Sequence, residues 1–131
     1  MIDHVSVHVA DYERSKAFFL AALAPLGYEL IMEFDQQQVP SLQTPKVCGL
    51  GAGGKPDLWL VPTTDKVVPT HLAFLAKSQA EVDAFHEAAL AAGGKDNGAP
   101  GPRPQYHPGY YGAFVIGPDG NNVEAVIHDH R

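Results

Sequence analysis

Hydrophobic and polar residues alternate along the first strand-length segment of the chain. From residue 4 to residue 9 every second position is a valine, and the positions between them are polar. This two-residue period predicts a β-strand with one apolar and one polar face. The two faces carry Val5, Val7 and Val9 on one side and His4, Ser6 and His8 on the other.

The spacing of apolar residues becomes helical after this segment. Between residues 12 and 25 they recur three and four positions apart, which predicts an amphipathic helix. Asp11 is suited to cap the start of this helix, and Gly27 is suited to end it. A second helical pattern follows Ser78, whose spacing to Glu81 predicts a capping box.

The chain repeats itself at an offset of 67 residues. Over positions 4–27, eight residues are identical to those 67 positions later, including His4 with His71 and Gly27 with Gly94. Each copy continues with three further stretches, at 28–34, 47–50 and 58–61 in the first and near 95, at 110–116 and at 122–128 in the second. The repeat predicts an α+β fold in which residues 1–131 form a single domain of two βαβββ modules, 1–66 and 67–131.

Two glycine- and proline-rich segments separate the predicted strands. Residues 98–109 contain four prolines, which predicts a long irregular loop of the kind that often carries function. Residues 49–55 match the start of a phosphate-binding loop, but Pro56 replaces the Ser or Thr that binds magnesium, and a strand-like stretch follows. A hairpin turn is therefore the favoured interpretation of this segment.

Composition and charge narrow the function classes. The 131 residues include 9 Lys and Arg against 15 Asp and Glu, giving a net charge of −6, so nucleic acid is an unexpected partner. No apolar run approaches the ~18 residues that span a membrane, and a cytoplasmic location is expected. The single cysteine, Cys48, is expected as a buried thiol in a strand rather than as a nucleophile.

Two histidines and a glutamate are the candidate metal ligands. His4 and His71 occupy matching positions in the first strand of each module, and Glu124 interrupts an apolar run in the last strand. An unpaired buried carboxylate would be costly, which suggests a cation, and two histidines with one carboxylate suit ferrous iron. The alternative is structural: each histidine is a satisfied core residue, and Glu124 pairs with Arg14, Arg103 or a lysine.

The last four residues, His-Asp-His-Arg, also contain potential metal ligands. A frayed chain end seldom forms a preorganised site. We therefore expect the histidines of this tail, His128 and His130, to be incidental to the metal site.

Three segments carry a resemblance to a known family. They are Ile-Asp-His-Val-Ser-Val at 2–7, His-Leu-Ala-Phe at 71–74 and Gly-Pro-Asp-Gly-Asn-Asn-Val-Glu-Ala-Val at 117–126. The chain thereby resembles the vicinal oxygen chelate superfamily, which includes glyoxalase I, bleomycin-resistance proteins and type I extradiol dioxygenases. The resemblance implies an eight-stranded incomplete barrel around a cleft, usually in a homodimer. It also implies a divalent cation, Fe, Mn, Ni or Zn, with His4, His71 and Glu124 at the family's ligand positions.

The sequence differs from the pattern of glyoxalase I at the position of the fourth ligand. There the first module of glyoxalase I supplies a carboxylate or an equivalent ligand, whereas this chain has Trp59, whose indole cannot bind a metal. Asp57 lies two residues earlier, and a shift in strand register would be needed to bring it to the centre. Three ligands remain, which resembles the dioxygenase set more than the glyoxalase set.

Two function classes stay open. The first is an enzyme in which the metal polarises a small substrate that chelates it through vicinal oxygens, by lyase, isomerase, transferase or dioxygenase chemistry. In this case His8, His107 and Tyr111 are the candidate acid–base or orienting groups. The second is a metal-free protein that sequesters a cationic aromatic ligand, as bleomycin-resistance proteins do, with aromatic contacts from Trp59, Tyr106, Tyr110 and Tyr111.

Overall fold

The computed structural model describes residues 1–129, and its first half forms a helix and a four-stranded sheet. The strands lie in the order β1-β4-β3-β2, with β1 parallel to β4 and the other neighbours antiparallel. The elements are β1 (Val5–Val9), α1 (Tyr12–Leu23), the 3₁₀ turn η1 (Ala24–Leu26), β2 (Glu29–Asp35), β3 (Lys46–Ala52) and β4 (Lys55–Pro62).

The second half repeats this topology. Its strands lie in the order β5-β8-β7-β6, and β5 is again parallel to the last strand of the module, β8. The elements are β5 (His71–Leu75), α2 (Gln79–Ala91), β6 (Lys95–Pro102), β7 (Tyr110–Ile116), the 3₁₀ turn η2 (Pro118–Gly120) and β8 (Asn122–His128). The chain therefore has the predicted α+β architecture of two tandem βαβββ modules.

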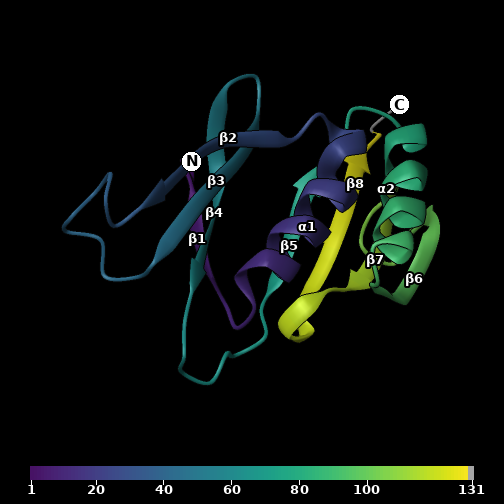
Figure 1. The fold of residues 1–131 in the computed structure, drawn as a ribbon. Coiled ribbons are helices and arrows are strands. Elements are labelled where there is room, and N and C mark those ends of the chain that lie inside the picture. Colours follow the sequence, from purple (N-terminus) through teal and green to yellow (C-terminus); the bar gives the residue numbers. More distant parts are fainter. Residues whose placement is uncertain (130–131) are drawn as a thin grey trace.

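Two helices pack against one another and each covers one face of a sheet (Figure 1). Phe18, Phe19 and Leu23 of α1, together with Val82 and Phe85 of α2, are buried in one hydrophobic core. Within residues 1–129, no helix covers the opposite face of either sheet. Within residues 1–129 no strand of one sheet pairs with a strand of the other, so the sheets form an incomplete barrel around a cleft.

The predicted helix caps are confirmed, and so is the predicted strand, except that β1 begins one residue after His4 and Val5 is 41% exposed. In β1, Val7 and Val9 are buried in the core, while the alternating polar residues are exposed. Asp11 accepts a hydrogen bond from the backbone N–H of Arg14, and Ser78 accepts one from that of Glu81. Local polar side chains thus satisfy N–H groups that the first helical turn leaves unpaired.

The predicted loop at 98–109 is shorter than expected, because β6 extends to Pro102. β6 is the edge strand of its sheet, where a proline without an N–H is tolerated. Its pairing with β7 is irregular, with register shifts between Asp96 and Gly98 and between Gly98 and Gly101. Edge position therefore explains why a proline-rich sequence forms a strand.

The glycine-rich segment at 49–55 forms the predicted hairpin. Gly53 and Gly54 connect β3 to β4 with φ angles of 67° and 80°. Positive φ at both positions is what a tight two-residue hairpin turn requires. Cys48 lies in β3 as a fully buried free thiol, as predicted. Neither helix in the described part of the chain is long and apolar enough to span a membrane.

Candidate functional site

His71 and Glu124 meet on the uncovered face of the second sheet. They belong to the adjacent parallel strands β5 and β8, and His71 Nε2 lies 2.9 Å from Glu124 Oε1. The His71 side chain is 52% exposed, whereas that of Glu124 is only 1% exposed. A nearly inaccessible carboxylate thus contacts an imidazole that solvent can reach.

The other oxygen of this carboxylate contacts Tyr110, a contact that the sequence does not predict. Its hydroxyl donates a hydrogen bond to Glu124 Oε2. Burial of the phenol and, as the second cause, this hydrogen bond raise the pKa of Tyr110. Gly112 leaves the space for this contact, since a Cβ there would lie 3.1 Å from Glu124 Oε2. The protein therefore provides a partner for each Glu124 oxygen. These partners are His71 and Tyr110, and not the arginine or lysine that the structural alternative considered.

His4 lies apart from this pair. Its Nδ1 contacts Asp3 Oδ1 at 2.7 Å, and Lys55 Nζ is 3.3 Å from the other oxygen of Asp3. His4 and His71 both line a cavity of about 630 Å³. Across residues 1–129, no three His, Cys, Asp or Glu side chains lie close enough together to hold a metal ion. One chain thus brings together two of the three predicted ligands.

Trp59 and Asp57, the two residues considered at the fourth ligand position, both lie on β4. Trp59 pairs in register with Ser6, and its indole is half-buried over Gly49 and stacked on Phe34 with a centroid separation of 6.3 Å. Asp57 lines the same cavity as His4 and accepts a hydrogen bond from Tyr28 through Oδ2 at 2.8 Å. The two residues add an aromatic surface and a tethered carboxylate to the uncovered side of the first module.

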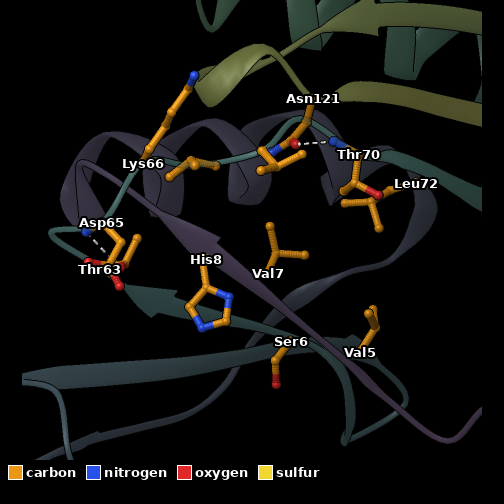
Figure 2. A pocket seen from close by; sticks show the side chains of 12 residues that line it. Val5, Ser6, Val7, His8, Thr63, Asp65, Lys66, Thr70, Leu72 and Asn121 are labelled. Atoms are coloured by element: carbon orange, nitrogen blue, oxygen red, sulfur yellow. Dashed lines mark hydrogen bonds between the residues drawn. The ribbon is translucent and has the colours of Figure 1, made fainter.

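His8 lines a neighbouring cavity of about 410 Å³ between β1 and the connection from β4 to β5 (Figure 2). Ser6 lines the same cavity, and Asn121 Oδ1 accepts a hydrogen bond from the Thr70 backbone N–H at its far wall. Both cavities are lined by Val5 and Leu72. His8 and His4 therefore line neighbouring cavities that share part of their walls.

The two acid–base candidates near the proline-rich loop, His107 and Tyr111, lie on opposite faces of the second sheet. Tyr111 donates to Asp83 Oδ1 of α2 at 2.7 Å, which places it on the helix side of the sheet, opposite Glu124. His107 lies on the Glu124 side, with its ring 5.4 Å from that of Tyr110 and its Nε2 3.0 Å from His128 Nδ1. Tyr110, rather than Tyr111, is thus the tyrosine of the site.

Comparisons with known proteins agree with this architecture. The family model described as "Glyoxalase/Bleomycin resistance protein/Dioxygenase superfamily" matches residues 1–125. The chain belongs to this superfamily. Among solved structures, a glyoxalase/bleomycin resistance protein from Albidiferax ferrireducens is 29% identical, with a TM-score of 0.68 over 96% of this chain and 97% of that one. No curated protein sequence matches the chain.

A glyoxalase I mutant from Zea mays is 27% identical, with a TM-score of 0.69. The match covers 95% of this chain but only 46% of the maize chain, so this protein spans about half the length of that relative. A family enzyme from Burkholderia phytofirmans, at 19% identity and a TM-score of 0.68 over 98% of both chains, shows the shared fold alone. Superfamily membership thus fixes the fold and leaves the reaction open.

The His71–Glu124 pair fits two positions in the shell of a divalent cation. Two ligands at ~2.1 Å from a metal and at right angles lie about 3.0 Å apart, close to the 2.9 Å between His71 Nε2 and Glu124 Oε1. Imidazole nitrogen and carboxylate oxygen are also the donors that Fe, Mn, Ni and Zn accept.

Proposed function

We propose that this chain is a metal-dependent enzyme of the superfamily, acting on a small substrate that binds the metal through two neighbouring oxygens. The reaction would be of the lyase, isomerase or dioxygenase type, with Fe, Mn, Ni or Zn as the cation. The observation that carries the proposal is the Glu124 carboxylate, which is 1% exposed and contacts the half-exposed imidazole of His71. A cytoplasmic location belongs to the same proposal and is compatible with the single free thiol, Cys48.

The residues around the pair have distinct tasks in this proposal. When bound, the cation supplies Lewis-acid polarisation of the substrate oxygens. Glu124 would hold it with a negative charge, and His71 would hold it through Nε2 once that nitrogen has lost its proton. Tyr110 fixes the orientation of the carboxylate by donating to Oε2. The exposed side of His71 leaves room for a substrate from the cavity.

Two of the acid–base candidates stay in the proposal. His8 lies on the exposed face of β1, in the cavity next to that of His4, and His107 packs against the ring of Tyr110. Both imidazoles are on the cleft side, where they could orient a substrate or transfer a proton. Tyr111 is not retained, because its hydroxyl is directed to Asp83 on the helix side of the sheet.

His4 would complete the ligand set in a homodimer. In one chain His4 is turned toward Asp3, while the pair that it should join lies on the other sheet. Among residues 1–129, β1 pairs only with β4 and β5 only with β8, which leaves one edge of each strand open. A second copy that covers these edges could bring the partner's His4 to His71 and Glu124.

A metal-free binding protein is the second candidate. The observation that favours it is that no three potential ligands converge within residues 1–129, while Trp59 and Phe34 form a stacked pair on the uncovered side of the first sheet. A planar cationic ligand would suit this aromatic surface and the net charge of −6. In this case Glu124 would be structural.

Metal titration of tag-free protein discriminates between the two candidates. We expect the wild type to bind a divalent cation with an affinity that falls as the pH is lowered, because protons compete for the ligands. Glu124→Gln, which keeps the size of the side chain and removes its charge, should lose one equivalent of metal, as should His71→Ala.

The matched control is His86→Gln, because His86 pairs with Asp96 of β6 on the helix-covered side of the second sheet and should not affect the metal. Equal titration of wild type and Glu124→Gln would reject the enzyme proposal. The binding-protein candidate would then be tested by quenching of Trp59 fluorescence with planar cationic ligands.

A further inference from the structure

A second pair of imidazoles lies at the end of the second sheet. His107 Nε2 and His128 Nδ1 are 3.0 Å apart, and the two rings are nearly parallel, with a centroid separation of 5.1 Å and an interplanar angle of 28°. His107 precedes β7 and His128 is the last residue of β8. Two ring nitrogens at this separation have the spacing of neighbouring metal ligands, which is about 3.0 Å.

The carbonyl oxygen of Pro108 determines which nitrogen of His107 carries a proton. His107 Nδ1 is 2.7 Å from the carbonyl oxygen of Pro108, and because a carbonyl can only accept, Nδ1 carries the proton. In the neutral imidazole, His107 Nε2 then holds a lone pair that can accept from His128 Nδ1. A histidine whose other nitrogen donates to a backbone carbonyl is the usual arrangement of a metal-ligating imidazole.

The surrounding backbone holds both histidines in place. His128 pairs in register with Tyr110, whose ring lies edge-on to His107 and His128 at 5.4 and 5.2 Å. Directly after His128, the Asp129 N–H donates to the carbonyl of Gly109. His128 is thus part of a paired strand and not of a frayed end, contrary to the expectation from the sequence.

We propose that His107 and His128 form a second metal site, which takes a borderline transition-metal cation such as Zn²⁺, Ni²⁺ or Cu²⁺. His107 Nε2 and His128 Nδ1 are the ligands, and water completes the shell. Imidazole is a common ligand for these three cations. The site needs one tautomer change, in which the proton of His128 moves from Nδ1 to Nε2, so two neutral imidazoles release no net proton.

This site is separate from the His71–Glu124 pair. His128 lies four residues beyond Glu124 on the same strand, which is about 13 Å at ~3.3 Å per residue. The proposal rests on no part of the proposed function. A cation bound here would, however, occupy the Nε2 lone pair of His107 and prevent His107 from acting as a base.

The test is a calorimetric titration with Zn²⁺ and Ni²⁺ of tag-free protein carrying His71→Ala, which removes the first site. We expect one equivalent of metal still to bind. Adding His128→Ala should weaken this binding about 100-fold, the factor by which two linked ligands exceed one. In nitrogen NMR spectra of the His71→Ala protein, Zn²⁺ should shift His107 Nε2 and His128 Nδ1 together. His86→Ala in the same background is the control and should change nothing.

Three outcomes would overturn the proposal. The first is a His71→Ala protein that binds no metal, which would leave the proposed function intact. The second is binding that survives His107→Ala at full affinity. The third is binding that His130→Ala abolishes and His107→Ala does not, because this would assign the metal to the chain end alone. A different result would reject the proposed function and support this site. In that result wild type and His71→Ala bind metal equally, and His128→Ala loses the binding.

Discussion

The buried carboxylate of Glu124 is held by contacts with its neighbours in the site. It is 1% exposed, and its two oxygens contact His71 and Tyr110, while Gly112 supplies the space. A buried charge is costly unless it is hydrogen-bonded, so loss of one partner should cost more than an ordinary hydrogen bond. The metal-free protein should therefore be sensitive to changes around this carboxylate.

Tyr110→Phe removes the donor to Glu124 Oε2 and keeps the ring. We expect the free energy of unfolding of the metal-free protein to fall by about 1–3 kcal/mol, because a buried carboxylate oxygen is left without its donor. Urea denaturation measures this change. Tyr106→Phe is the control, since Tyr106 is 58% exposed, and its change should stay within ~0.5 kcal/mol. Equal effects of the two variants would contradict the importance of the Tyr110–Glu124 contact.

The hydrogen bonds of Glu33 predict how the free energy of unfolding depends on pH. Lys16 Nζ and the Tyr12 hydroxyl donate to Glu33 Oε2 at 2.8 and 2.7 Å, and together they lower the pKa of Glu33, with Lys16 as the larger cause. A lowered folded-state pKa contributes stability above the unfolded-state pKa, and this contribution is lost as the pH falls through the folded-state value.

We therefore expect the wild type to lose stability below about pH 4 more steeply than Glu33→Gln. Urea denaturation at a series of pH values between neutral and acid measures the difference. Glu13→Gln is the control, because Glu13 is 73% exposed and its nearest cation, Lys46, is 3.9 Å away. Parallel pH profiles of wild type and Glu33→Gln would contradict the prediction.

At the scale of elements, local signals predicted the helices and long-range pairing decided the site. The caps at Asp11 and Ser78 need only residues three positions ahead, so the sequence predicts them. The stretch at 110–116 is apolar on both faces, and alternation could not tell which of Tyr110 and Tyr111 faces Glu124. The His107–His128 contact depends on the register between β7 and β8, which no local pattern encodes.

Gly109 precedes β7 and lies against the backbone that follows the end of β8. Its φ is 89°, and a Cβ there would lie 1.3 Å from the backbone oxygen of Asp129. Gly109→Ala should separate the end of β8 from the loop, lower the free energy of unfolding by at least about 3 kcal/mol and weaken the second metal site. Gly53→Ala is the control: its φ is 67° but its Cβ would meet nothing within 4 Å, so only ~1 kcal/mol of backbone strain is expected. Similar losses in urea denaturation would contradict this comparison.

At the scale of the whole molecule, exposed apolar residues gather along the open edges of β1 and β5. Ile2, Val5 and Leu75 are 85%, 41% and 71% exposed, and all three line the cavity between His4 and His71. Open strand edges beside exposed apolar side chains are typical of surfaces that another chain covers. A homodimer that buries them is therefore expected.

Leu75→Glu tests this surface. Because Leu75 is apolar and exposed on β5, a charge there should shift the protein from twice its 14.0 kDa chain mass to the single mass. Light scattering at micromolar concentration measures the mass. Met32→Glu places the same charge on β2, at the other edge of the first sheet, and should leave a dimer intact. A wild type that is monomeric at this concentration would contradict the prediction.

Mixing two variants that each lack one proposed ligand tests whether the two chains of the dimer share a metal site. His4→Ala lacks one proposed ligand and His71→Ala lacks another, so homodimers of either variant have no complete site. If the partner's His4 completes each site, a mixed dimer contains one site with every ligand intact and one site that lacks two. Metal binding should then return to one cation per mixed dimer, measured by calorimetry with His128→Ala in both chains so that the second site does not contribute. If each chain builds its own site, both sites of the mixed dimer lack a ligand and binding should not return.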